Sequence, residues 1–401
     1  MPVQGVPVSV RRSTDLGSVA DRALSAGSPR SRRRKEGDAV VTAPSPLFDF
    51  DDAGGVLAAD VDGILRSAAL GGAQIRAVAA AVDEGLLGRL TDMHPRSVVF
   101  VGTDARARSA AELVVAMFGG QAGVPLVSAP ATPPWVGALD VVVVSGNDAG
   151  DPELARSIDA GLRRSAEVVV DAPDEGPVRA VSAGRAMSLP PRVRVQTRYV
   201  LARHVAVFCA VLGVLQRAVR ITGVPPLAEV ADTADEEAAR SHPSNEVFHN
   251  PAKSLAVRMQ SRRVVFAGDS AVTTVLARHA SESLLQEAGV VAGAAALSDV
   301  LVARDRLTNV VTASGENYDP FFHDEELDGP APIAPARVFV VSTDPDRSAA
   351  QRRTAALPDV ELMSVIGEFE SSTVPTVLEQ VAVLTVRTEM AAAYLGLAGG
   401  R

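Results

Sequence analysis

Cysteine and aromatic residues are scarce in this sequence, and basic residues are fewer than acidic ones. Cys209 is the single cysteine among 401 residues, which excludes a disulfide framework and a zinc site made of four cysteines. Aromatic residues amount to 4%, so alanine, valine and leucine must fill the core, and we expect Cys209 to act there as a small hydrophobic residue. Hydrophobic residues nevertheless reach 47%, which suffices for a sizeable core and excludes a wholly disordered chain.

The charge balance and the short apolar runs exclude two classes of partner. With 39 basic and 48 acidic residues the formal net charge is −9, which argues against a nucleic-acid binder. The most apolar stretch, 199–214, carries Arg203 and His204 and stays apolar for about ten residues, below the roughly 18 to 20 that span a bilayer. We therefore expect a soluble cytoplasmic protein whose partners are neither nucleic acids nor membranes.

The beginning of the chain differs from the rest. Residues 1–35 are rich in arginine, serine, glycine and proline and contain no continuous apolar stretch, so they predict neither a secretory signal nor a membrane anchor. We interpret residues 1–45 as a disordered basic leader. A basic tail that contacts anionic partners is the alternative.

Short β-branched runs alternate with amphipathic stretches along the remaining sequence. The expected strands are 97–101, 139–144, 167–171, 263–267, 337–341 and 360–363, and the expected helices include 152–164, 272–287 and 373–397. Continuous apolar strands that alternate with helices predict parallel sheets covered on both faces. The predicted fold class is therefore α/β with two doubly wound, flavodoxin-like domains. Because prolines and acidic residues cluster after residue 223, we expect the first domain at 46–225 and the second at 226–401.

Two tight turns form the candidate ligand site. In open parallel sheets ligands lie at the carboxyl ends of the strands, where the turns 102–104 and 145–148 fall. Backbone N–H groups at the helix starts that follow can bind phosphate or another anion. A nicotinamide site needs a Gly-x-Gly-x-x-Gly pattern after a strand, of which VGTDARARS and AGDSAVTTV each have only the first glycine. The histidines lack paired metal-ligand spacing. We therefore predict an anion site without cofactor or metal.

Seven segments occur in the same order as in a known family. They are VVFVGTDARARSAAEL, VVVVSGNDAGDPELARS, SLPPRV, NPAKSLA, RRVVFAGDSAVTTVLARHASESLLQEA, FFHDEELDG and EMAAAYLGLAGG. Their order resembles the bifunctional phosphoglucose/phosphomannose isomerase family, whose members have two sugar isomerase (SIS) domains. The resemblance runs from about Leu47 to Gly399 and implies that both expected domains are SIS-like.

The resemblance implies a reaction and its residues. The reaction is aldose–ketose isomerisation of glucose 6-phosphate or mannose 6-phosphate to fructose 6-phosphate, in which a base moves a proton through an enediolate and a donor stabilises the oxyanion. Carried over by position, Glu287 stands for the base, His323 for the ring-opening histidine and Arg192 for the oxyanion arginine. Glu282 is a rival for the base. The implied phosphate ligands are Gly102, Thr103, Arg106, Ser145, Gly146 and Asn147.

The resemblance also implies a hexose phosphate as ligand and a homodimer, because in the family the partner subunit offers the histidine. Three departures support another interpretation. Asp148 stands where the family has a threonine, Val143 replaces a serine, and no lysine follows the last helix. A carboxylate about 4 Å from an anion costs about 4 kcal/mol per pair of unit charges at an effective dielectric near 20. The alternative function is a catalytically degenerate SIS-type protein that binds a carbohydrate phosphate and acts in regulation, and a different SIS activity is a third possibility.

Overall fold

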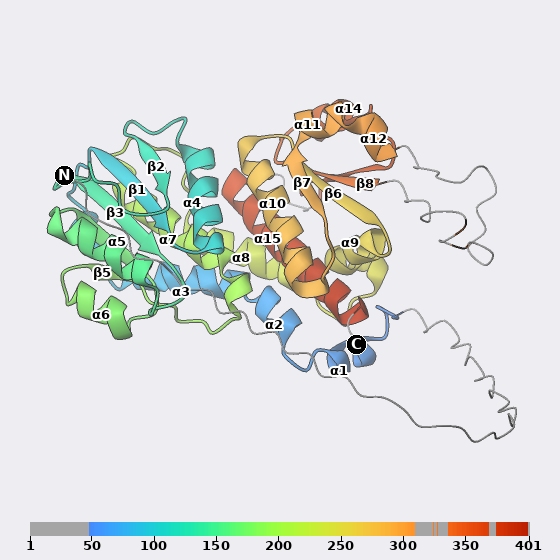
Figure 1. Cartoon of the computed structure of the whole chain (residues 1–401), viewed down its shortest axis with the longest axis horizontal. Coiled ribbons are helices and arrows are strands. Elements are labelled where there is room, and N and C mark those ends of the chain that lie inside the picture. Colours follow the sequence, from blue (N-terminus) through green and yellow to red (C-terminus); the bar gives the residue numbers. More distant parts are fainter. Residues whose placement is uncertain (1–47, 309–323, 325–326, 328–335, 369–373, 400–401) are drawn as a thin grey trace, which may run out of the picture. The chain divides into compact units, whose positions relative to one another are not determined.

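A computed structural model describes residues 48–308, 324, 327, 336–368 and 374–399 (Figure 1). The predicted leader at 1–45 and the candidate histidine His323 lie outside these described residues.

Two parallel β-sheets organise the described residues (Figure 1). The first sheet has the strand order β2-β1-β3-β4-β5 and the second has the order β7-β6-β8-β9, with parallel pairing throughout. The strands are β1 (Ser97–Gly102), β2 (Leu126–Ala129), β3 (Asp140–Ser145), β4 (Glu167–Asp171), β5 (Met187–Ser188), β6 (Arg263–Gly268), β7 (Gly293–Ala296), β8 (Ala336–Val341) and β9 (Val360–Met363). This arrangement confirms the predicted α/β class with two doubly wound parallel sheets.

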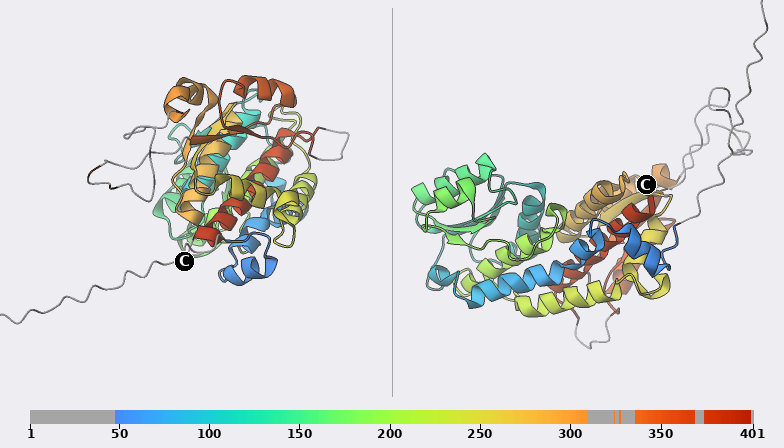
Figure 2. Two further views of the ribbon diagram at one scale, coloured as in Figure 1. Left: turned by 90° about the vertical axis from the view of Figure 1, so that its right-hand side faces the viewer. Right: turned by 90° about the horizontal axis from the view of Figure 1, so that it is seen from below.

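Helices cover the sheets and join them. They are α1 (Ala53–Ala59), α2 (Ile64–Ala69), α3 (Gly71–Asp83), α4 (Ala105–Phe118), α5 (Pro152–Arg163), α6 (Gly176–Ser182), α7 (Leu201–Leu215), α8 (Leu227–Arg240), α9 (Pro251–Met259), α10 (Ala271–Ala288), α11 (Leu297–Val302), α12 (Arg304–Thr308), α14 (Arg347–Thr354) and α15 (Val377–Gly399), with short 3-10 helices η1 (Gly88–Leu90), η2 (Thr197–Tyr199) and η3 (Val247–His249). Helices α3 and α8 lie side by side, and α15 packs on both α8 and α10 (Figure 2).

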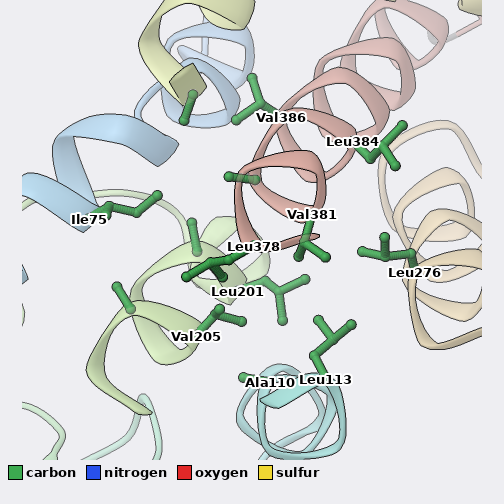
Figure 3. Close-up of a cluster of buried hydrophobic side chains, with 14 of the residues drawn as sticks. Ile75, Ala110, Leu113, Leu201, Val205, Leu276, Leu378, Val381, Leu384 and Val386 are labelled. Carbon is green, nitrogen blue, oxygen red and sulfur yellow. The ribbon is translucent and has the colours of Figure 1, made fainter. Parts of the chain in front are cut away.

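One hydrophobic cluster connects the two sheets. Side chains of α3, α4, α7, α10 and α15 meet in it, among them Ile75, Leu113, Leu201, Leu276 and Val381 (Figure 3). Helices α3 and α8 belong to different expected domains, on either side of residue 225, but they pack together. This contact does not mark a boundary between the domains, so the boundary stays a prediction.

Helix α15 is apolar because most of its side chains are buried in this cluster. It begins where Thr376 and Glu379 cap each other, because the Glu379 carboxylate accepts from the Thr376 N–H at 2.6 Å and the Thr376 hydroxyl accepts from the Glu379 N–H at 3.3 Å. By length and composition it could cross a membrane, but 89% of its most apolar window is buried inside the structure. A core helix passes the same test, so the support for a membrane span is weak.

Each sheet repeats one close approach between its first strand and the next helix. A Cβ on Gly102 would lie 2.4 Å from the Arg108 backbone N, and one on Gly268 would lie 2.1 Å from the Thr274 backbone N. Only glycine lets α4 and α10 start this close to β1 and β6. The same geometry therefore presents two helix N-termini, one at the carboxyl edge of each sheet.

Candidate functional site

The two predicted turns adjoin at the carboxyl edge of the first sheet. Gly102 pairs with Ser145 in the parallel register of β1 and β3, and the Thr103 N–H donates to the Ser145 carbonyl at 3.1 Å. A Cβ on Gly146 would lie 2.5 Å from Thr103 Oγ1, so a larger residue here would have to displace the Thr103 hydroxyl. The structure thus brings these four predicted phosphate ligands together.

Asp104 occupies two backbone N–H donors of this edge, those of Ala107 and Asn147. Its carboxylate caps α4 by accepting from the Ala107 N–H at 2.9 Å. The same carboxylate accepts from the Asn147 backbone N–H at 3.0 Å and from Asn147 Nδ2 at 2.7 Å. A phosphate that binds to these two N–H groups must therefore displace an anion that the chain already supplies. Asp148, which the sequence singles out as the obstacle, instead turns back to accept from the Gly150 N–H at 2.8 Å.

A buried polar network holds Asn147 in place. Its Oδ1 accepts from Arg203 Nη2 at 2.6 Å, and Arg203 Nη1 donates to Asp171 Oδ1 at 2.8 Å. His204 Nδ1 lies 2.5 Å from the other oxygen of Asp171. Burial alone would raise the pKa of Asp171, but Arg203 and then His204 outweigh it and hold this pKa below its ordinary value. The hydroxyl of Ser145 is fully buried beside Asp171 and helps to lower its pKa, so this side chain faces the network.

The guanidinium of Arg106, a predicted phosphate ligand, donates hydrogen bonds to three side chains of α10. Nη1 donates to Glu282 Oε2 and to His279 Nδ1, both at 2.8 Å, and Nη2 donates to Gln286 Oε1 at 2.8 Å. Nε donates to the Arg198 carbonyl at 3.2 Å. With 4% of its surface exposed, Arg106 joins the first sheet's helix to the second sheet's helix.

A buried acid lies behind this arginine. Because Arg106 donates to His279 Nδ1, the proton of the neutral ring is on Nε2, which donates to Glu389 Oε1 at 3.0 Å. Burial raises the pKa of Glu389 to about 8, with Arg106 opposing this rise and Glu287 adding to it. Burial and then the charge of Arg106 hold the pKa of His279 well below its ordinary value. The pair is therefore a neutral acid beside a neutral imidazole at pH 7.

The candidate base Glu287 lies in the same region. Its side chain is 2% exposed and contacts Arg198 Nε as an ion pair. Burial, and then the proximity of Glu287, raise the pKa of Tyr199. Glu282, the rival base, pairs with Arg106 and is 33% exposed. Both carboxylates thus have an arginine partner, and both lie in the C-terminal part of α10.

Arg192, the predicted oxyanion arginine, does not contact Glu287 or Glu282. It forms a bidentate pair with Glu84 at the end of α3, with N–O distances of 2.7 and 2.5 Å. Arg198, six residues later and absent from the sequence-based site, is the arginine that contacts Glu287. His323 lies outside the described residues, so its role stays a prediction.

A cleft of about 530 Å³ opens between the two turns, η2 and α10. Three aspartates and two arginines line it, namely Asp104, Asp148, Asp151, Arg106 and Arg198. Gln286 also faces the cleft, whereas Glu287 is not among the lining residues and lies behind Arg198. Within the described ranges, no group of three or more His, Cys, Asp or Glu side chains could hold a metal ion.

Comparisons with known proteins identify the fold. No model of a protein family matches the sequence, and no curated protein matches it either. Among solved structures, a tagatose-6-phosphate ketose/aldose isomerase from Escherichia coli has a TM-score of 0.56 and 12% identity over 89% of this chain and 96% of that one. A glucosamine-6-phosphate deaminase from Thermotoga maritima has a TM-score of 0.54 and 10% identity over 84% and 95% of the two chains.

The C-terminal domain of glucosamine-fructose-6-phosphate aminotransferase from Francisella tularensis is similar as well, with a TM-score of 0.55 and 9% identity over 85% of this chain and 96% of that domain. At such low identity these likenesses show the fold alone. The chain therefore has the two-sheet α/β fold of SIS-type phosphosugar isomerases.

Proposed function

We propose that this protein is a phosphosugar isomerase that interconverts the aldose and ketose forms of a hexose 6-phosphate in the cleft. The observation that carries the proposal is the ion pair between Glu287 and Arg198, because it sets a buried carboxylate beside a cation that lines the cleft. A carboxylate and a cation at one edge of a sugar-sized cavity are what an enediolate reaction requires.

Glu287 is the proposed base. It takes the C2 proton of the open-chain aldose, and the same carboxyl group returns this proton to C1, while a proton passes between the oxygens on C2 and C1. Arg198 stabilises the enediolate oxyanion, so it takes the role that the sequence resemblance assigns to Arg192. Because Glu287 lies behind Arg198, the guanidinium must move from the carboxylate to the substrate oxygen when the sugar enters.

A coupled assay tests this proposal. Fructose 6-phosphate is supplied and glucose 6-phosphate is measured through its dehydrogenase. Glu287→Gln should lower kcat by about 10²-fold or more, the range expected for a general base, while Glu282→Gln keeps most turnover. The opposite order would assign the base to Glu282. Loss in neither variant, with the wild type active, would contradict the mechanism.

The two arginines give a matched comparison. Arg198→Gln removes the proposed oxyanion donor, so we expect kcat to fall by about 10²-fold or more. Arg192→Gln breaks an ion pair whose partner Glu84 is exposed and should change kcat less than about threefold. Equal effects of the two changes would leave Arg198 without a special role.

A second candidate function is a non-catalytic binder of a carbohydrate phosphate that acts in regulation. The observation that favours it is the Asp104 carboxylate on the N–H groups of Ala107 and Asn147, because this anion competes with a substrate phosphate. For this candidate the coupled assay shows no turnover, while calorimetry with fructose 6-phosphate still shows binding.

We further propose that the protein is cytoplasmic and a homodimer in which His323 of one subunit reaches the cleft of the other. The support is the sequence resemblance described above. Mixing inactive Glu287→Gln with inactive His323→Ala should restore part of the turnover if each dimer then contains one intact composite site. No recovery in verified mixed dimers would contradict a shared site.

A further inference from the structure

A second cavity lies beside β9, the edge strand of the second sheet. It has a volume of about 460 Å³ and is bounded by β9, α9, η3 and α14, together with the end of α8 and the middle of α15. None of its lining residues is shared with the cleft at β1 and β3. Among the described strands β9 pairs only with β8, so the main chain of its other edge adds polar groups here. We call this cavity the arginine pocket.

Positive charge dominates the lining of the arginine pocket. The charged groups that face it are Arg240, Arg258, Arg347, Arg387, Glu361 and Glu368, together with His249. Four guanidinium groups stand against the two lining carboxylates and the buried Glu237, which pairs with Arg387 and Arg240, so the net formal charge is about +1 with the imidazole neutral. A cavity with this balance attracts anions.

Two arginines of the pocket, Arg258 and Arg347, have guanidinium N–H donors without an acceptor among the described residues. Arg387 is held by Glu237 and Glu368. Arg258 pairs with Glu361 through Nη2 and donates from Nη1 to Ser254 Oγ, both at 2.8 Å, while its Nε is buried with no hydrogen-bond partner among the described residues. Among the described residues, Arg347 has acceptors for Nη1 alone, namely the Ser364 and Ile366 carbonyls at 3.4 and 3.1 Å. Planar guanidinium groups with unused N–H donors match the oxygens of a phosphate group.

The mouth of the pocket adds an apolar contact. Phe248 is 90% exposed, which is unusual in a chain with so few aromatic residues. Its ring lies edge-on to His249 with the centroids 5.1 Å apart, and both residues line the pocket. A ring in the ligand would therefore have aromatic faces to pack on.

We propose that the arginine pocket is a second anion site that binds a small phosphate ester. The phosphate lies between Arg347 and Arg258, and the organic part points toward Phe248 and His249. Because this site is separate from the cleft, the proposal does not depend on isomerase activity, and a ligand bound here would regulate rather than react.

Gln351 offers a direct test. It lies on the exposed side of α14 and lines the pocket, so Gln351→Glu adds one negative charge there with little risk to folding. Arg352→Gln is the matched control: it changes the net charge by the same amount on the next residue, whose side chain is 71% exposed and outside the pocket lining. Calorimetry would use adenosine monophosphate, glucose 6-phosphate and inorganic phosphate as probes.

We expect at least one of the two esters to bind, with Gln351→Glu weakening its Kd by about tenfold or more and Arg352→Gln by less than about twofold. Arg347→Met should weaken it similarly to Gln351→Glu. Hydrogen exchange locates the bound ester: protection should fall on peptides covering 347–364. Comparison of the two esters tells a nucleotide from a sugar phosphate as the source. No ester binding, equal effects of Gln351→Glu and Arg352→Gln, or protection confined to 102–108 and 145–151 would overturn the proposal.

Discussion

The first strand–turn–helix unit of each sheet, β1–α4 and β6–α10, has the same backbone geometry, but the aspartate in its turn has different surroundings. Gly102 and Gly268 both allow a helix to start against a strand, and an aspartate lies in both turns. In the second unit Asp269 is closed off: its side chain is 4% exposed, Arg353 pairs with it at 2.9 Å, and Ser342 donates to it. In the first unit Asp104 has only N–H partners among the described residues, and it lines an open cleft.

The difference indicates where a ligand can act. A buried aspartate that already has an arginine partner and closed surroundings serves the stability of the fold. A carboxylate that occupies anion-binding N–H groups at the edge of a cavity can be exchanged for another anion. The first unit is therefore the candidate site, and the second is its structural counterpart.

The largest expected effect is on the pH dependence of stability, and it comes from Glu389, which lies where Arg106 of the first unit contacts His279 of the second. The pKa of Glu389 is about 8 in the folded chain against an ordinary value of 4.5. Between pH 4.5 and 8 the Glu389 carboxyl is therefore protonated in the folded state and ionised in the unfolded state. Titration of this group alone should lower the free energy of unfolding by up to about 4 kcal/mol as the pH rises from about 5 through 8. The lowered pKa of its partner His279 has the opposite effect below about pH 6.5, so the net fall should appear between about pH 6.5 and 8. Denaturant unfolding at a series of pH values measures this fall.

Glu389→Gln should flatten that dependence, because glutamine can still accept from His279 and does not titrate. Glu236→Gln, an exposed glutamate of α8, is the control and should leave the slope as in the wild type. A Glu389→Gln protein with an unchanged slope would show that Glu389 is not the titrating group.

The shared geometry itself can be broken in either unit. Gly102→Ala and Gly268→Ala each force a Cβ against helix backbone at 2.4 and 2.1 Å, so each should lower the free energy of unfolding by about 3 kcal/mol. Gly120→Ala, where a Cβ meets no atom within 4 Å, should change it by less than about 0.5 kcal/mol. A tolerated Gly102→Ala would mean that the first unit is looser than the second.

A smaller effect should separate the two aspartates. Arg353→Met leaves Asp269 buried without its cation, which should cost about 1–2 kcal/mol of stability and leave ligand binding in the cleft unchanged. Thermal unfolding and calorimetry on the same sample check both parts. If Arg353→Met altered binding in the cleft, the second unit would not be merely structural.

The sequence predicts the central strands well, because they are continuous β-branched runs buried on both faces. Strands β1, β3 and β4 match their expected ranges to within one residue at each end. Strand β7 escapes prediction because its sequence, Gly-Ala-Ala-Ala, has no β-branched residue. Strand β5 has only two residues, too short for any periodicity.

The site is only partly predictable for a physical reason. Parallel strands end at one edge, so the adjacency of the two turns follows from the sequence. The partners of Arg106 do not, because His279 is 173 residues away and only tertiary packing brings it near. Arg203 and His204 do leave a signal, as polar residues in an apolar helix, but their partner Asp171 lies at the end of a separate strand.

The most direct measurement concerns Asp104. Asp104→Ser keeps an N-cap of α4, because serine caps as well as aspartate, and removes the resident negative charge from the Ala107 and Asn147 N–H groups. Calorimetry with fructose 6-phosphate should then give a Kd at least about tenfold lower than in the wild type, equivalent to about 1.4 kcal/mol. An unchanged or weaker affinity, in a variant that folds normally, would contradict the assignment of this turn as the anion site.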